Sequence, residues 1–110
     1  MASRKFNKLA QALNRAVSAY KTGKLADAES LCKQIISSNR DHFDALHNLA
    51  IVEAALGKND LALTSYDRAL ALHPNHADAL NNRGNTLLAL KRFDEALELR
   101  SRARRALELC

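Results

Sequence analysis

Three asparagines, Asn14, Asn48 and Asn82, recur at intervals of 34 residues. Each lies in an alanine- and leucine-rich segment typical of a helix, where asparagine is unfavourable because its amide competes for backbone hydrogen bonds. A primary amide offers two hydrogen-bond donors and one acceptor. It can therefore pair with the backbone of an extended peptide without selecting the side chains of that peptide. The regular spacing indicates that the three amides serve one such purpose.

The histidines and cysteines show no pattern typical of a metal site or a catalytic centre. His73 and His76 flank Pro74, but no cysteine or carboxylate cluster completes a set of ligands around them. We expect the histidines to be loop residues between helices. Cys32 and Cys110 have neither metal-site nor disulfide-framework spacing. The chain also lacks a glycine-rich phosphate loop, so we expect no metal, no cofactor and no enzymatic activity.

Charge and hydropathy exclude further classes of protein. The formal net charge is +5 at pH 7, but the only basic cluster is RSRARR at residues 100–105, which we expect to be a solvated helix face rather than a nucleic-acid site. No apolar run approaches the ~20 residues of a membrane span. The N-terminus is no secretory signal, and its lack of acidic residues before Asp27, a feature of mitochondrial transit peptides, also fits the repeat described next. We therefore expect a cytoplasmic protein.

The elements that position the asparagines form a repeat of 34 residues. Shifting the sequence by that period aligns Gly23 with Gly57 and His42 with His76, and it aligns Ala28, Ala62 and Ala96. Three units follow, at residues 9–42, 43–76 and 77–110. We predict one domain over residues 1–110, in which residues 1–8 extend the first helix.

Each unit is predicted to be a pair of antiparallel helices. In the second unit, apolar positions recur at steps of three and four residues until Gly57 ends the first helix, and Pro74 ends the second. The residues of this packing stripe are Leu46, Leu49, Ala50, Glu53 and Leu56. Alanines at 62 and 69 allow the two helices to approach closely.

This pattern resembles the tetratricopeptide repeat, a helical-hairpin family with the same period. The second unit carries the resemblance best, through Leu46, Leu49, Ala50, Ala62, Tyr66, Ala69 and Pro74. The resemblance implies an all-α, right-handed superhelical solenoid of three helix-turn-helix repeats and a non-enzymatic role in protein–protein interaction. The first unit departs from the family at Ile35 and Arg40, and the third at Lys91, Arg100 and Glu108.

The asparagines lie away from the packing stripe. On a helical wheel with Leu46 at the origin, the stripe falls within about 80°, whereas Asn48 lies opposite, between about 140° and 200°. The residues on that opposite side are Asp44, Asn48, Ile51 and Ala55 in the second unit, Asp78, Asn82, Asn85 and Ala89 in the third, and Ala10, Asn14, Val17 and Lys21 in the first. Small residues such as Ala55 and Ala89 leave this inner surface hollow.

The asparagine row is similar to that of O-linked N-acetylglucosamine transferase repeats, where such a row holds the backbone of substrate peptides. The resemblance implies peptide binding by Asn14, Asn48 and Asn82. The full set of predicted peptide-binding residues is Asn14, Asn48, Asn82, Asn85, Asp44, Asp78, Lys21, His47 and Ile51. Three alternatives stay open: the asparagines are merely tolerated at the surface, the chain is the targeting arm of an enzyme such as a glycosyltransferase, or it is a self-associating scaffold.

A resemblance to the chaperone-adaptor members of the family does not extend to their binding site. Those members hold a C-terminal carboxylate with a clamp of lysine, asparagine and arginine. Among the matching positions here, Leu13, Val17, Asn48, Asp78 and Asn82, only Asn48 agrees. We therefore do not expect this chain to bind the tails of heat-shock chaperones.

Two further predictions concern packing. The last helix carries an apolar stripe at Ala96, Leu99, Ala103, Ala106 and Cys110. We expect this stripe to pair with a second copy of the chain, or with a further repeat of a longer protein, because stacked repeats need a cap. Glu53 and Arg83 both replace apolar residues, and we expect them to form an ion pair across the repeat interface because a lone buried charge is costly.

Overall fold

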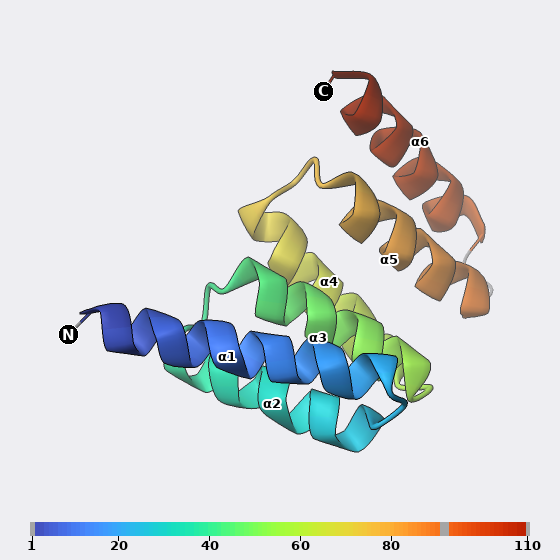
Figure 1. Cartoon of the computed structure of the whole chain (residues 1–110). Helices are drawn as coiled ribbons and strands as arrows, with labels where there is room; N and C mark the ends of the chain where they lie inside the picture. The colour runs from blue at the N-terminus through green and yellow to red at the C-terminus, as the bar shows by residue number, and fades with distance from the viewer. Residues whose placement is uncertain (1, 91–92, 110) are drawn as a thin grey trace.

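The computed structural model describes residues 2–90 and 93–109, with side chains for residues 8–90, 95 and 97–108. This part of the chain holds six helices and no strand. The helices are α1 (Ala2–Lys21), α2 (Leu25–Ser38), α3 (Phe43–Ala55), α4 (Asn59–Leu72), α5 (Ala77–Ala89) and α6 (Phe93–Leu109). They follow one another as three hairpins, from α1–α2 near the N-terminus to α5–α6 at the other end (Figure 1). The predicted all-α solenoid is confirmed.

Glycines end the first helices of the first two hairpins. Gly23 has a φ of +80° and Gly57 a φ of +79°, in the left-handed region that side chains with a Cβ avoid. After α3, the amide of Gly57 donates to the carbonyl of Ala54 at 3.0 Å and the amide of Lys58 to that of Glu53 at 2.8 Å. These bonds satisfy the last carbonyls of α3 and turn the chain sharply into α4.

Histidines begin the first helices of the second and third hairpins. Nδ1 of His42 accepts a hydrogen bond from the amide of Ala45 at 3.1 Å, and Nδ1 of His76 accepts one from the amide of Ala79 at 3.2 Å. Each imidazole thereby satisfies one of the free amides at a helix N-terminus. The prediction that these two histidines lie between helices is confirmed, and the structure adds their role as N-caps.

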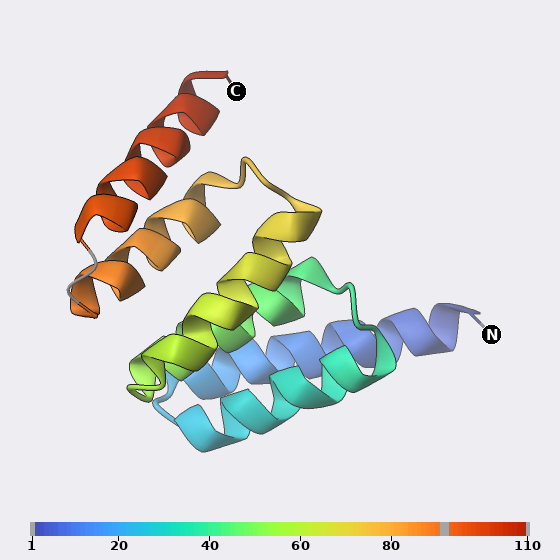
Figure 2. The same ribbon diagram turned by 180° about the vertical axis from the view of Figure 1, so that it is seen from behind.

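The hairpins stack through their first helices. α3 packs against α2 and α1, and α5 packs against α4 and α3, as the view from behind also shows (Figure 2). Ala28, Ala62 and Ala69 are completely buried. Their small side chains allow the two helices of a hairpin to approach closely, as the repeat pattern predicts.

The predicted stripe on α6 is not a free surface. Leu99, Ala103 and Ala106 are only 5%, 1% and 6% exposed, and Leu99 and Ala103 pack with Leu80 and Leu87 of α5. The prediction that this stripe is left uncovered for a second copy is therefore wrong. The same three-four spacing serves packing inside a hairpin, and α5 already occupies it. The other predicted members, Ala96 and Cys110, lie outside the described side chains.

The predicted ion pair between Glu53 and Arg83 is also wrong, because each side chain has another partner. The hydroxyl of Ser65 donates to Oε1 of Glu53 at 2.6 Å, and Nε of Arg83 donates to Oδ1 of Asp67 at 2.8 Å. Glu53 is 4% exposed, and burial raises the pKa of its carboxyl while the bond from Ser65 lowers it. A hydroxyl on the facing helix of the same hairpin thus supplies the donor that Glu53 needs.

Candidate functional site

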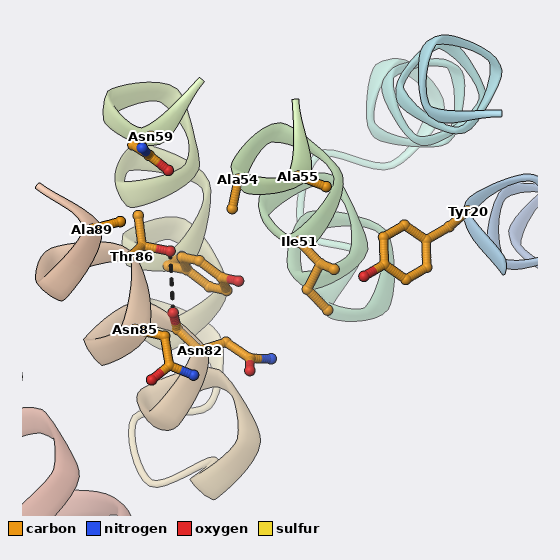
Figure 3. A pocket seen from close by; sticks show the side chains of 10 residues that line it. Tyr20, Ile51, Ala54, Ala55, Asn59, Asn82, Asn85, Thr86 and Ala89 are labelled. Atoms are coloured by element: carbon orange, nitrogen blue, oxygen red, sulfur yellow. Dashed lines mark hydrogen bonds between the residues drawn. The ribbon is translucent and has the colours of Figure 1, made fainter. Parts of the chain in front are cut away.

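The inner face of the solenoid contains a hollow, which we call the groove. It has a volume of about 510 Å³ and lies mainly between α3 and α5, with α4 behind them and one side chain from α1 (Figure 3). Its lining residues are Tyr20, Ile51, Ala54, Ala55, Asn59, Tyr66, Asn82, Asn85, Thr86 and Ala89. None of these ten residues carries a charge at neutral pH, although the chain as a whole is basic.

Small side chains make the groove hollow. Ala54 and Ala55 line one side and Ala89 the other, so no long side chain fills the space between α3 and α5. The expectation from the helical wheel for Ala55 and Ala89 is confirmed. Tyr66 of α4 is 2% exposed and packs with Ala50 and other residues of α3 and α4. Its burial raises the pKa of the phenol, which therefore stays neutral.

Asn82 is held on both sides. Its Nδ2 lies 3.2 Å from Nε2 of His47 on α3, and its backbone carbonyl accepts a bond of 3.1 Å from the hydroxyl of Thr86 (Figure 3). Burial, and then the neighbouring His76, lower the pKa of His47. The imidazole is therefore neutral at pH 7, and its unprotonated Nε2 can accept from the amide. This bond ties the first helices of two hairpins together beside the groove.

Asn85 follows one helical turn after Asn82 and is exposed. Its side chain reaches into the same open space as that of Asn82 (Figure 3). Oδ1 of Asn85 accepts a bond of 3.2 Å from the guanidinium of Arg100 on α6. The nitrogen of this amide has two hydrogens to donate, and the contact with Arg100 fixes its orientation.

The structure brings together only some of the predicted peptide-binding residues. Ile51, Asn82 and Asn85 line the groove. Asn48 instead donates from Nδ2 to the carbonyl of Asp44, one turn earlier in its own helix, at 2.8 Å. The remaining predicted residues outside the groove lining are exposed, namely Asn14, Lys21, Asp44 and Asp78. The three asparagines of the 34-residue row are therefore not equivalent.

His47 belongs to a cluster of rings next to the groove. The ring of Phe43 lies 4.5 Å from that of His73 and 4.7 Å from that of His76, and His47 lies 5.4 Å from His76. A second hollow of about 530 Å³ opens beside this cluster and is lined by Phe43, Asp44, Leu72, His73, Pro74, Asn75 and His76. The rings fill the junction between the second and third hairpins, which positions Asn82.

Four groove residues were not predicted from the sequence, namely Tyr20, Asn59, Tyr66 and Thr86. Tyr20 lies 34 residues before Ala54, so the repeat alignment could have placed both on the same face. Tyr66 fits the core pattern, and its approach to the groove depends on the small residues around it. No sequence signal marks Asn59, which begins α4 and reaches the groove only because the hairpins stack.

Neither a metal site nor a membrane span is found in the described residues. Within residues 2–90 and 93–109, no three histidine, cysteine, aspartate or glutamate side chains are grouped to hold a metal ion. In the same part of the chain, no helix combines the length and the hydropathy needed to cross a membrane. The groove, whose polar groups are amides, hydroxyls and phenols, is therefore the site that we consider further.

The fold and the groove define a helical-repeat solenoid with a polar, uncharged inner face. The sequence pattern of the tetratricopeptide repeat matches residues 13–64 and 47–108, which together span most of the chain. The chain belongs to the tetratricopeptide repeat family. No curated protein matches the sequence.

Solved structures of other proteins have the same fold. The type III secretion translocator chaperone SycD of Yersinia enterocolitica, solved as an alternative dimer, is 20% identical with a TM-score of 0.89, over 93% of this chain and 77% of that one. The first repeat domain of Spaghetti (RPAP3), bound to the HSP90 peptide SRMEEVD, is 21% identical with a TM-score of 0.87, over 91% of this chain and 79% of that one.

A structure of MamA (AMB-1) is 22% identical with a TM-score of 0.85. The match covers 93% of this chain and 60% of that MamA chain. This chain therefore spans little more than half the length of the MamA structure that it resembles. At these identities the likeness establishes the fold alone.

Proposed function

We propose that this chain is a protein-interaction module that holds an extended peptide segment in the groove between α3 and α5. The observation that carries the proposal is the combination of amides, hydroxyls and alanines along one hollow of about 510 Å³. Side-chain amides can pair with peptide N–H and C=O groups, and the alanines leave space for a second backbone. Structurally similar repeats include one solved with a bound peptide.

The groove favours an uncharged segment of the peptide. A charged side chain placed against the ten uncharged lining residues would lose water without gaining a partner of opposite charge. The peptide SRMEEVD bound in the RPAP3 structure carries two consecutive glutamates near its C-terminus. We therefore propose that the selectivity of this chain differs from that of RPAP3, in agreement with the missing cationic clamp.

The proposal also covers the wider role of the chain. We infer that it acts by binding rather than by catalysis, and that the same groove would serve either a free-standing adaptor or the targeting arm of a longer enzyme. We propose a reducing, cytoplasmic setting because Cys32 is a free thiol buried in the core. Its burial raises the pKa of the thiol to about 11, which disfavours the reactive thiolate.

Selection from a random-peptide display library, followed by titration of the enriched peptide, tests the proposal. We expect the double variant Asn82→Ala/Asn85→Ala to weaken binding by about tenfold or more, since each lost hydrogen bond contributes about 0.5 to 1.5 kcal/mol. The matched control is Asn14→Ala/Asn48→Ala, which removes two amides outside the groove and should leave the affinity nearly unchanged.

Two results would overturn the proposal. One is equal binding by the wild type and the Asn82→Ala/Asn85→Ala variant, with both folded by circular dichroism. The other is a larger loss in the Asn14→Ala/Asn48→Ala control, which would restore the asparagine row as the binding surface. Failure to enrich any peptide that binds the folded chain would also count against a peptide groove.

A further inference from the structure

One side of α6 exposes two leucines and two arginines in a line. Leu97 and Leu107 are 61% and 63% exposed, and Arg100 and Arg104 between them are also exposed. Their spacing of three, four and three residues places all four side chains on the same side of the helix. We call these four residues the end stripe. It is separate from the buried stripe of Leu99, Ala103 and Ala106.

The repeat shows what the end stripe is built to contact. Thirty-four residues before Leu97 lies Leu63 of α4, which is 6% exposed because it packs with Leu80 and Leu87 of α5. In the same way, Arg104 corresponds to Leu70, which packs on that cluster. The positions that form the end stripe on α6 therefore bury themselves, on α4, against the first helix of the next hairpin.

The geometry accordingly fits a helix lying on α6 as α5 lies on α4. A leucine that is more than half exposed loses favourable burial of about 1.5 to 3 kcal/mol, so two on one line favour a partner. The arginines then define the chemistry of that partner. At the positions of Tyr66 and Leu70 the end stripe carries Arg100 and Arg104, and only a helix with carboxylates between its apolar residues complements them.

The contacts within the chain leave the stripe basic. The recorded bond of Arg100 is to the neutral amide of Asn85 at 3.2 Å, which does not neutralise the guanidinium charge. Arg102 bonds the carbonyl of Pro74 at 3.3 Å, and Arg105 is exposed beside it. The field around the stripe is therefore positive, and it attracts acidic groups.

A second copy of this chain does not complement the end stripe. At the positions where α3 presents Leu49, Val52 and Leu56 to the preceding hairpin, α1 presents Arg15, Ser18 and Thr22. Head-to-tail stacking would set polar residues and Arg15 against a basic surface. Antiparallel pairing of two end stripes would set Arg100 of each copy against Arg104 of the other, and such like-charge contacts are unfavourable.

We propose that the end stripe docks an acidic amphipathic helix of a partner protein, in the position on α6 that corresponds to that of α5 on α4. Leu97 and Leu107 contact apolar residues of that helix, and Arg100 and Arg104 pair with its carboxylates. This surface is independent of the groove, so the chain has two interaction sites of different chemistry: an uncharged one for an extended peptide and a basic one for a helix.

Fluorescence anisotropy with three hydrocarbon-stapled helical peptides tests this proposal. The peptides share one pattern of leucines and carry glutamate, glutamine or lysine at the positions between them. We expect the glutamate peptide to bind at least about tenfold more tightly than the lysine peptide. In the variant Arg100→Glu/Arg104→Glu this order should reverse.

Matched variants separate the end stripe from general charge and apolar effects. Arg105→Glu changes the same type of charge on another side of α6 and should keep the order of the three peptides. Leu97→Gln/Leu107→Gln should weaken the glutamate peptide about tenfold or more, whereas Leu61→Gln, at a leucine of α4 that is 53% exposed, should not. Asn82→Ala/Asn85→Ala should leave helix binding unchanged, which separates this test from that of the groove.

Several results would overturn the proposal. These are absence of binding by the glutamate peptide, equal affinity for all three peptides, and NMR shift changes at the groove rather than at residues 97–107. A concentration-dependent dimer that is lost in Arg100→Glu/Arg104→Glu would assign the surface to a second copy. RNA binding that is lost in that variant, without binding of the glutamate peptide, would assign it to nucleic acid.

Discussion

The two junctions between the hairpins are built from different side chains. In the first junction, Ala16 and Cys32 pack with Leu49, and two more alanines pack with Val52. In the second, a continuous cluster of mainly leucine joins α4, α5 and α6, consisting of Leu63, Leu80, Leu87, Leu99 and Ala103. The same repeat position holds Cys32 in the first hairpin and Tyr66 in the second.

This difference explains why the groove lies at the second junction. The large ring of Tyr66 lies behind the inner face at the second junction, where the small residues Ala55 and Ala89 keep the surface open. At the repeat position of those two alanines, α1 carries Lys21, a long charged side chain. A repeat thus becomes a site through two substitutions: an aromatic residue on the second helix and an alanine on the first.

The largest expected effect concerns the core of the second junction. Leu87 is completely buried, so Leu87→Ala should lower the free energy of unfolding by about 2 to 5 kcal/mol. Cys32→Ala in the first junction removes a single sulfur and should cost on the order of 1 kcal/mol. Urea denaturation followed by circular dichroism measures both. Equal losses would contradict the difference between the junctions.

The buried carboxyl of Glu53 gives the next effect. Ser65→Ala removes the donor to Glu53 and should cost about 1 to 3 kcal/mol at neutral pH, because the carboxylate is left unsatisfied. Burial raises the pKa of Glu53 above its usual 4.5, so its contribution to stability is full below that pH and is lost as the pH rises through the higher folded value. In Glu53→Gln this part of the pH dependence of urea unfolding should vanish. Identical pH profiles for the wild type and Glu53→Gln would refute this account.

A smaller effect with the opposite sign is expected at His47. Burial and the neighbouring His76 lower the pKa of His47 below its usual 6.5, whereas Asp44 and Asp78 act against this shift. The contribution of His47 is therefore present above pH 6.5 and is lost as the pH falls towards the lower folded value. The unfolding free energy of wild type should fall more than that of His47→Gln between about pH 7.5 and 5.5. A steeper fall in His47→Gln would contradict the prediction.

The smallest effect is expected at the surface ion pair of the second junction. Nε of Arg83 lies 2.8 Å from Oδ1 of Asp67, but the aspartate side chain is 61% exposed. Water and salt screen such a pair, so Asp67→Asn should lower the free energy of unfolding by less than about 1 kcal/mol. The loss should shrink further in high salt. A loss comparable to that of Leu87→Ala would mean that electrostatics rather than leucine packing holds this junction.

The sequence was sufficient to predict the solenoid because repeat period and helix periodicity depend on local chemistry. Gly57 and the alanines at 28, 62 and 69 behave as their residue types require. The wheel also separated the inner face from the packing stripe and correctly made Ala55 and Ala89 part of a hollow. These features are set by the residue itself and by its nearest neighbours along the helix.

The remaining features depend on which hydrogen-bond partners the stacked helices bring together. Asn48 and Asn82 occupy the same repeat position, yet one amide donates within its own helix and the other to His47. Glu53 has Ser65 as its partner rather than Arg83, because facing helices of one hairpin lie closer than the pattern alone reveals. The stripe of Leu99 and Ala103 has the spacing of an intermolecular contact but packs inside its own hairpin.

The most direct test of the groove compares tryptophan substitutions at one repeat position. Ala89 lines the groove and Lys21 does not, and both side chains are exposed, so neither change disturbs the core. Calorimetric titration with the peptide selected from the display library should show that Ala89→Trp weakens binding at least about tenfold, whereas Lys21→Trp changes it by less than about threefold. Equal affinities for the two variants, or a larger loss in Lys21→Trp, would contradict a peptide site at the second junction.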